Sequence, residues 1–297
     1  MRYAIGVDLG GTNIRAALVN ELGEILEVVK EKTTGKTINS IKKQIIDIIS
    51  KLDYKKYNIE GIGIGVPGPV KPDGTIIYIP NLGINEEVNL KQLIEEELHI
   101  KTFVGNDANV AALAEAFVGN AKGYDVVQYI TVSTGIGGGL IINKKIITGK
   151  YGLAQEIGSM IIRNGGRAPS INKPQGCIEG EASGTMLTIK ANEAGLNCQH
   201  AGDLFIKAQE GNEIAIKLVD QFVDDFAAFI SSIVSYIEPD IFVLGGGLMK
   251  SKDYFLDRVI KRVDELSYKT LKGNIKIVVA KYDQDCGIIG AAMQCFN

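Results

Sequence analysis

Short apolar runs of strand length, separated by glycine-rich or polar turns, make up the first thirty residues. The runs at 3–8, 14–19 and 24–30 are joined by tight turns, so they predict a meander of three β-strands. The residues after the first glycines are too few before the next turn to form a typical helix, which disfavours a dinucleotide-binding fold or a Walker loop. Asp8 therefore stands at the end of a buried strand, beside a hairpin turn.

The spacing of apolar residues then becomes helical. Between residues 38 and 52 they recur every three or four positions, which predicts an amphipathic helix with its N-terminal cap at Asn39 or Ser40. A strand is expected at 61–66, and a strand, a turn and a helix at 103–119. These elements complete a first α/β lobe.

The plan of the first thirty residues restarts at 129–149, with a strand, a polar residue at its end, a glycine-rich turn and two further strands. This likeness suggests an internal repeat, one copy in each of two related lobes. The later elements expected are a core helix at 214–237, a buried strand that leads into three glycines at 241–247, a strand at 275–280, and helices near 251–266 and from about 285. The predicted fold class is α/β throughout.

Length and composition limit the possible classes of protein. The chain has 297 residues, more than one ordinary core, which agrees with two lobes. Its net charge of −3 gives no reason to expect a nucleic acid or a membrane as partner, so a small polar ligand is favoured. No apolar run approaches the roughly 20 residues of a membrane span and no signal peptide is seen, so a cytoplasmic location is expected.

Histidine and cysteine usage restricts the chemistry. Because the chain has two histidines, any general acid–base catalysis is expected to use carboxylates. The four cysteines form no CxxC pair and are expected to be free buried thiols.

Two glycine-rich turns are candidates to hold a polyphosphate, because glycines present backbone N–H groups without side-chain obstruction. Each turn taken alone could equally serve only its hairpin. Asp8 could hold Mg²⁺, through water, or could bond the N–H groups of its own turn. The residues expected at the phosphates are Gly10, Gly11, Thr12, Asn13, Thr134, Gly135, Gly137 and Gly138.

Two further motifs have both a structural and a functional interpretation. In GNDAN, at 105–109, an Asn or Asp could cap the following helix, or Asp107 could be a general base that deprotonates a substrate hydroxyl. The triple glycine Gly245, Gly246 and Gly247 suits close approach to a flat ligand such as adenine, or a tight turn. Isolated glutamates such as Glu156 and Glu179 are usually surface residues.

The order of these motifs resembles the ROK family (repressors, open reading frames and sugar kinases) of the actin-like ATPase superfamily, over essentially the whole chain. DLGGT alone is moderately specific, whereas the ordered set is highly specific. The motifs are, in order, DLGGTN, GVPGPV, NDAN, VSTGIGGG, QEIG, GCIEGEASG, VLGGG and GIIGAA.

The resemblance implies a two-lobed, actin-like (ribonuclease H-like) α/β fold with a cleft between the lobes. The small lobe would comprise residues 1–119 plus about 285–297, and the larger lobe residues 120–284. ATP and Mg²⁺ would be held between the hairpins and a hexose mainly beside the first lobe, and a homodimer is expected.

The same resemblance assigns residues of the site. Asp107 matches the catalytic base, and the triple glycine matches the turn on the adenosine side. Ser159 stands where most members have a histidine, which leaves the choice of sugar open. The positions that match the sugar site are Gly68, Asn106, Asp107, Glu156, Ser159 and Glu179.

The family's zinc motif, Cys-x-Cys-Gly-x-x-Gly-Cys-x-Glu, is altered in this chain. Its cysteine positions hold Ser170, Asn172 and Cys177, so one thiolate remains where tetrahedral zinc needs four ligands. No structural zinc is expected.

Together these observations predict an ATP-dependent, glucokinase-like kinase that phosphorylates a hexose, at the 6-OH in the first instance. The alternatives are a kinase for N-acetylmannosamine, fructose or a β-glucoside, or a non-catalytic sugar-binding or regulatory member. A repressor is disfavoured because Asp8 leaves no room for a preceding helix-turn-helix module.

Overall fold

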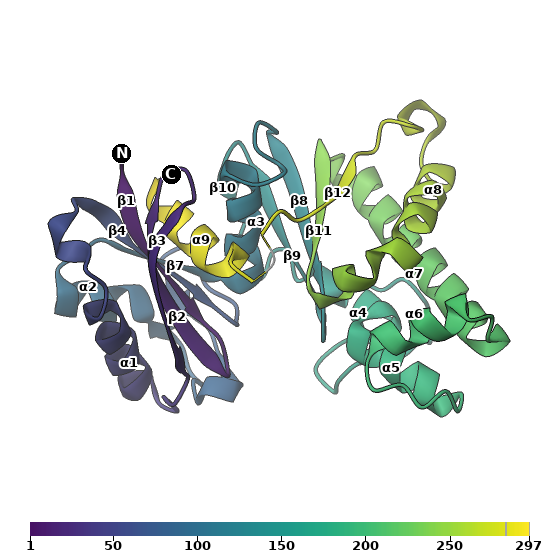
Figure 1. Cartoon of the computed structure of the whole chain (residues 1–297), viewed down its shortest axis with the longest axis horizontal. Coiled ribbons are helices and arrows are strands. Elements are labelled where there is room, and N and C mark those ends of the chain that lie inside the picture. Colours follow the sequence, from purple (N-terminus) through teal and green to yellow (C-terminus); the bar gives the residue numbers. More distant parts are fainter. Residues whose placement is uncertain (283, 297) are drawn as a thin grey trace. The chain divides into compact units, whose positions relative to one another are not determined.

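The computed structural model describes residues 1–282 and 284–296 and has an α/β fold with two mixed five-stranded sheets (Figure 1). The chain divides into unit 1 (Met1–Tyr129, Gly139–Gln155 and Ala280–Asn297) and unit 2 (Ile130–Gly138 and Glu156–Val279). The predicted two-domain α/β fold is confirmed. The lobe boundaries expected from the sequence stay a prediction, and Asn297 lies outside the described residues.

The first sheet has the strand order β3-β2-β1-β4-β7, so the predicted meander is followed by two strands that run parallel to β1. A short hairpin, β5 with β6, precedes α2. The elements are β1 (Tyr3–Leu9), β2 (Asn13–Asn20), β3 (Ile25–Lys32), α1 (Ile38–Ser50), β4 (Ile59–Val66), β5 (Thr75–Ile76), β6 (Val88–Asn89), α2 (Leu90–Leu98), β7 (Thr102–Asn106), α3 (Asp107–Phe117) and α9 (Cys286–Met293).

The second sheet has the order β10-β9-β8-β11-β12, again a meander followed by two later strands. Figure 1 shows the helices α4 to α8 gathered in unit 2. The elements are β8 (Val126–Val132), β9 (Ile136–Ile142), β10 (Lys145–Ile146), α4 (Ile178–Ala182), α5 (Gly184–Glu193), α6 (Ala201–Gln209), α7 (Glu213–Ile237), β11 (Ile241–Gly245), α8 (Leu256–Leu266) and β12 (Ile277–Val279).

The two faces of β1 pack against different helices, because successive side chains of a strand point to opposite faces. Ile5 and Val7 are fully buried in a core cluster that includes the apolar face of α1. Gly6 faces α9 instead, where a Cβ atom would clash with the carbonyl of Ile288. Asp8 shares the face of Gly6, so the fold directs its carboxyl toward the start of α9.

The N-terminal cap of α1 differs from the prediction of Asn39 or Ser40. Thr37 is the N-cap: its side chain accepts the N–H of Ser40, and the Ser40 hydroxyl accepts the N–H of Thr37. This reciprocal pair satisfies two N–H groups that lack partners within a helix, so the helix begins at Ile38, the first residue of its apolar stripe.

The region after β11 differs from the prediction in its helix. The strand itself leads into the triple glycine as expected: it ends at Gly245, and Gly246, with φ 89° and ψ 168°, turns the chain. The helix expected near 251–266 is a 3-10 helix, η4 (Gly247–Tyr254), followed by α8. The helices α2, α4, α5 and α6 were not predicted.

Candidate functional site

The register of the first sheet brings three predicted site residues to one edge. β1, β4 and β7 are parallel, and Asp8, Gly65 and Gly105 lie side by side across them. Asn106 ends β7 and Asp107 begins α3. Since neighbouring strands are about 4.8 Å apart, about 10 Å separates the backbone of Asp8 from that of β7. Such carboxyl edges are where α/β sheets commonly bind ligands.

Asp8 is a partly buried carboxyl in a confined place. A Cβ atom on Gly287, at the start of α9, would lie 3.2 Å from it. Burial raises the pKa of Asp8, and the charge of Arg15 only partly opposes this effect. Arg15, which pairs with Asp8 across β1 and β2, also bonds Asp285 and the Gln284 carbonyl. An ionised Asp8 is therefore costly here unless a further cation joins it.

The first glycine-rich turn is fixed by its neighbours and open at its tip. Gly10 donates its N–H to the carbonyl of Asn13 over 2.9 Å. Thr33 donates its hydroxyl to the Gly10 carbonyl over 2.7 Å and its N–H to the Thr12 carbonyl over 2.9 Å. Gly11 and Thr12 are exposed, so the tip is accessible to a ligand.

Asn106 is the N-cap of α3, one of the two interpretations of the GNDAN motif. Its Oδ1 accepts the N–H groups of Ala108 and Asn109 over 3.0 and 3.3 Å. Its amide nitrogen donates to the Gly68 carbonyl over 3.2 Å, which ties the helix to the loop after β4. Asp107 is exposed, and its Oδ1 accepts the Ala108 N–H over 2.7 Å. The cap thus fixes the backbone that presents the Asp107 carboxylate.

Unit 2 contains a cavity of about 400 Å³ at which two predicted nucleotide motifs meet. Thr134, from the second glycine-rich turn, and Gly247, from the triple glycine, both line it. The start of α5 lines it too, and Gly184 donates its N–H to the Ser133 carbonyl over 2.8 Å. Residues far apart in the sequence therefore form one concave surface.

Gly246 allows the turn after β11 to approach β8 closely. A Cβ atom at this position would clash with the Val132 carbonyl and lie 2.7 Å from Thr131 Oγ1. Its backbone conformation, with φ 89° and ψ 168°, is one that only glycine adopts readily. The glycine is thus a requirement of the turn.

Glu179 lies beneath the second glycine-rich turn rather than at the surface. Its Oε2 accepts the Ile136 N–H over 2.9 Å, and a Cβ atom on Gly135 would lie 2.7 Å from this oxygen. A Cβ atom on Gly158 would lie 3.2 Å from the same oxygen. Gly158 and Ser159 belong to the 3-10 helix η3 (Ile157–Ser159), which begins after Glu156. The predicted sugar-site residues of unit 2 therefore lie on adjoining segments.

Lys173 is a neighbour of this cluster that the sequence analysis missed. Its ammonium lies 3.4 Å from Glu179 Oε2 and 3.8 Å from Glu156 Oε2. The lysine lies within the altered zinc motif, at its first glycine position, and the fold of its loop creates both contacts. The available signals were this replacement of a glycine by a positive charge and its place shortly before the GCIEGEASG motif.

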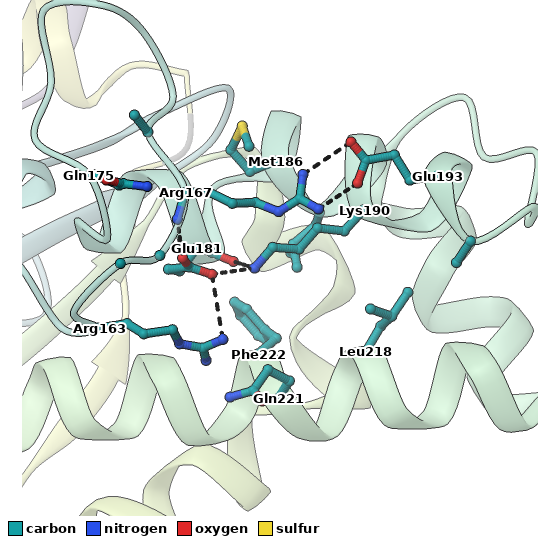
Figure 2. Close-up of a pocket in the computed structure, with 15 residues that line it drawn as sticks. Arg163, Arg167, Gln175, Glu181, Met186, Lys190, Glu193, Leu218, Gln221 and Phe222 are labelled. Carbon is teal, nitrogen blue, oxygen red and sulfur yellow. Dashed lines mark hydrogen bonds and ion pairs between the residues drawn. The ribbon is translucent and has the colours of Figure 1, made fainter.

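A cavity of about 870 Å³ in unit 2 is lined by none of the predicted site residues. Figure 2 shows Glu181 between Arg163 and Lys190, and Arg167 paired with Glu193. Burial alone would raise the pKa of Glu181, but hydrogen bonds from Lys190 and from the Arg167 N–H outweigh it, so the pKa is lowered. Each of these cations already has a carboxylate partner, which favours a structural role.

The described residues contain no group of three or more His, Cys, Asp or Glu side chains arranged to hold a metal ion. The expected absence of structural zinc stays a prediction. All four cysteines are free, as expected, although Cys286 and Cys295 are only partly buried. Burial raises the pKa of Cys286 to about 11 and that of Cys295 to about 12, so neither thiol ionises near neutral pH.

The helices of the described part of the chain include none with the length and apolar character to cross a membrane.

Comparison with known proteins gives full-length matches. The model of the ROK family matches residues 4–295. The chain is 30% identical to the glucokinase of Halalkalibacterium halodurans, over 97% of this chain and 93% of that protein. The ROK hexokinase structure from Thermus thermophilus has a TM-score of 0.89 and 28% identity, covering 99% of this chain and 98% of that one.

A second solved structure is a ROK family glucokinase from Streptomyces griseus in complex with glucose and AMPPNP. It has a TM-score of 0.78 and 28% identity, and the match covers 98% of each chain. Because the family model spans nearly every residue and the relatives match from end to end, the chain belongs to the ROK family.

Proposed function

We propose that this protein is an ATP-dependent sugar kinase that transfers the γ-phosphoryl group to a hexose hydroxyl, with the 6-OH of glucose as the first expectation. The observation that carries the proposal is the cavity at which Thr134 and Gly247 meet. The Streptomyces griseus relative was solved with glucose and an ATP analogue, which correspond to the two substrates of this reaction.

The nucleotide would lie with its adenosine against Gly245 to Gly247. Backbone N–H groups of the two glycine-rich turns, 10–13 and 134–138, would donate to the phosphates. The N-terminus of α5 lines the same cavity and adds a partial positive charge. These donors together suit a polyphosphate.

Asp8 fits the role of a Mg²⁺ neighbour. Magnesium prefers carboxylate oxygens and keeps several waters, so contact through water is sufficient. A cation here would offset the cost of ionising a buried carboxyl whose pKa is raised by burial. Bound together with ATP, Mg²⁺ would neutralise part of the negative charge of the phosphates.

Asp107 would act as the catalytic base. Its carboxylate would accept the proton of the sugar hydroxyl as the oxygen attacks the γ-phosphate, a contribution of about 10²- to 10⁴-fold. Transfer requires the base and the nucleotide to act on the same bound sugar.

The sugar would be bound mainly through carboxylates and amides. Asn106, Glu156 and Glu179 would accept or donate hydrogen bonds with its hydroxyls, and Gly68 would line the pocket. Ser159 is smaller than a histidine and leaves room for a substituent. A sugar with such a substituent, N-acetylmannosamine or a β-glucoside, is therefore an alternative substrate, and fructose is a further alternative within the family.

The test is ADP release with glucose, fructose, N-acetylmannosamine, N-acetylglucosamine and cellobiose, in parallel with the Asp107→Asn variant. We expect turnover of at least one sugar, a loss of about 10²- to 10⁴-fold in kcat for the variant, and sugar binding largely kept. No turnover of any sugar would favour a non-catalytic sugar-binding protein. Unchanged turnover in the variant would refute Asp107 as the base.

A further inference from the structure

The loop that precedes α4 places one cation beside two carboxylates. Lys173 Nζ lies 3.4 Å from Glu179 Oε2 and 3.8 Å from Glu156 Oε2. Both distances are longer than that of a short ion pair, so the ammonium lies between the two glutamates and interacts with each of them. The side chains of Lys173 and Glu179 are only 23% and 16% exposed, which weakens the screening of their interaction by solvent.

The two oxygens of Glu179 have different surroundings. Oε2 accepts both the Lys173 ammonium and the Ile136 N–H at the start of β9. Within residues 1–282 and 284–296, no donor bonds the other oxygen, Oε1. The protein thus holds the carboxylate through one oxygen, and among the described residues the other oxygen keeps its capacity to accept a hydrogen bond.

The backbone around Lys173 is well anchored. Its own N–H donates to the Ser170 carbonyl over 3.2 Å, and the Gly176 N–H donates to the Arg167 carbonyl over 2.7 Å. The loop is held at its other end by the Glu181 carboxylate, which accepts the Arg167 N–H over 2.6 Å. The ammonium is therefore presented from a fixed loop.

We propose that Lys173 is a positioning residue for the sugar, a role that rests on the proposed kinase function. Its ammonium offsets the repulsion between Glu156 and Glu179 and fixes Glu179 so that Oε1 accepts a hydrogen bond from a sugar hydroxyl. Without it, two like charges would move apart and the acceptor would lose its orientation. Sugar affinity would fall while nucleotide binding and the chemical step would persist.

The experiment compares Lys173→Met with Lys173→Arg in the intact protein. We expect Lys173→Met to raise the sugar KM about tenfold or more, with kcat and the KM for ATP within about twofold of wild type. Lys173→Arg keeps the charge and should recover most of the affinity. The control Lys56→Met removes an exposed lysine–carboxylate pair, with Asp53, and should change none of these constants.

Circular dichroism verifies that each variant is folded, and Lys173→Gln replaces Lys173→Met if the latter is not. An unchanged sugar KM in the folded variant would overturn the proposal, as would an equal rise in the KM for ATP, which would indicate a general loss of structure. If wild type turns over no sugar, the proposed function fails instead. Calorimetric titration with glucose then tests Lys173 alone, and equal affinity of wild type and variant would overturn its role.

Discussion

Gly246 illustrates how one residue permits the close approach of the turn after β11 to β8, next to the cavity lined by Thr134 and Gly247. Substitution to alanine would force a side chain into a glycine-only region of φ and ψ and against the Val132 carbonyl. We expect Gly246→Ala to lower the free energy of unfolding by about 3 kcal/mol, as strain and overpacking add. Urea denaturation measures the loss.

Gly195 is the matched control, because its φ is also positive, at 80°, but no atom lies within 4 Å of a Cβ atom there. Gly195→Ala should cost only about 1 kcal/mol from its backbone conformation. Equal losses in the two variants would show that close approach at Gly246 contributes nothing.

The carboxylate of Asp8 is expected to lower the stability of the folded protein while it contributes to Mg²⁺ binding. Because burial raises its pKa, ionised Asp8 destabilises the folded protein above that raised pKa, and the cost disappears as the pH falls toward the ordinary value of 3.8. Asp8→Asn should therefore raise the free energy of unfolding at pH 7 by about 1 kcal/mol. It should also weaken the apparent Mg²⁺ affinity about 10- to 100-fold in the kinase assay.

Denaturation of wild type and Asp8→Asn at pH 7 and pH 4 separates these effects. The stability difference should narrow in acid, since a larger fraction of wild-type Asp8 is then protonated in the folded protein. A variant that is less stable at pH 7 would contradict the destabilising effect of the partly buried carboxylate of Asp8. A variant that keeps the normal Mg²⁺ dependence would contradict the role of Asp8 beside the cation.

Among the elements, the loop before α4 depends on a buried carboxylate (Figure 2). Glu181 is 2% exposed and accepts Lys190 Nζ over 2.7 Å and the Arg167 N–H over 2.6 Å. Lys190→Met leaves a buried charge without its main partner and should cost about 3 kcal/mol. Thermal or urea unfolding measures this, with Lys252→Met as control, because its partner Asp253 is exposed and should contribute less than about 1 kcal/mol.

The pH dependence of the same pair has a defined sign. The pKa of Glu181 is lowered, so its stabilisation is present above the ordinary value of 4.5 and is lost as the pH falls through the lowered pKa. The difference between wild type and Lys190→Met should therefore shrink below pH 4.5. A constant difference down to pH 3 would mean that Lys190 acts through packing alone.

Sequence patterns predicted the elements whose periodicity is strong and local. The strands of both meanders, α1 and α7 were found within a few residues, because alternation or a helical stripe marks them. The helix α4 lies within the GCIEGEASG motif and α5 begins at its last residue, and the buried Met186, Leu187 and Ala191 of α5 form no regular stripe. Tertiary contacts and the Ser183 cap determine α5, so the pattern alone was insufficient.

At the scale of the whole molecule, short motifs identified the candidate site residues, whereas the charged neighbours of those candidates could not be identified from the sequence. The DLGGTN and NDAN motifs led to Asp8 and Asp107, which the sheet register then brought to one edge. Lys173 acquires its role only through the fold of its loop. Such positioning depends on the distances between charged side chains in the folded protein, which the spacing of residues along the sequence does not determine.

Binding of the sugar and binding of the nucleotide should each stabilise the protein, and a substitution should be able to remove one effect without the other. Nucleotide binding is assigned to a cavity whose lining residues all belong to unit 2, whereas Asp107 belongs to unit 1. At 100 times their Kd values, glucose and AMPPNP should each stabilise the protein by about 2.7 kcal/mol, or roughly 5–10 °C in Tm. Asp107→Asn should largely keep both shifts because asparagine removes the proton acceptor but keeps the size and a hydrogen-bonding oxygen of the side chain.

Gly247→Leu should abolish the AMPPNP shift and keep the glucose shift. Its backbone has no unusual φ, and a Cβ atom would make ordinary contact with Ser133 Oγ at 3.4 Å, so the larger side chain fills the cavity without straining the fold. Gly247→Ala is the size control and should keep both shifts. Differential scanning fluorimetry measures them. If Gly247→Leu kept the AMPPNP shift, the nucleotide would have to bind outside this cavity, and the triple glycine would serve only as a turn.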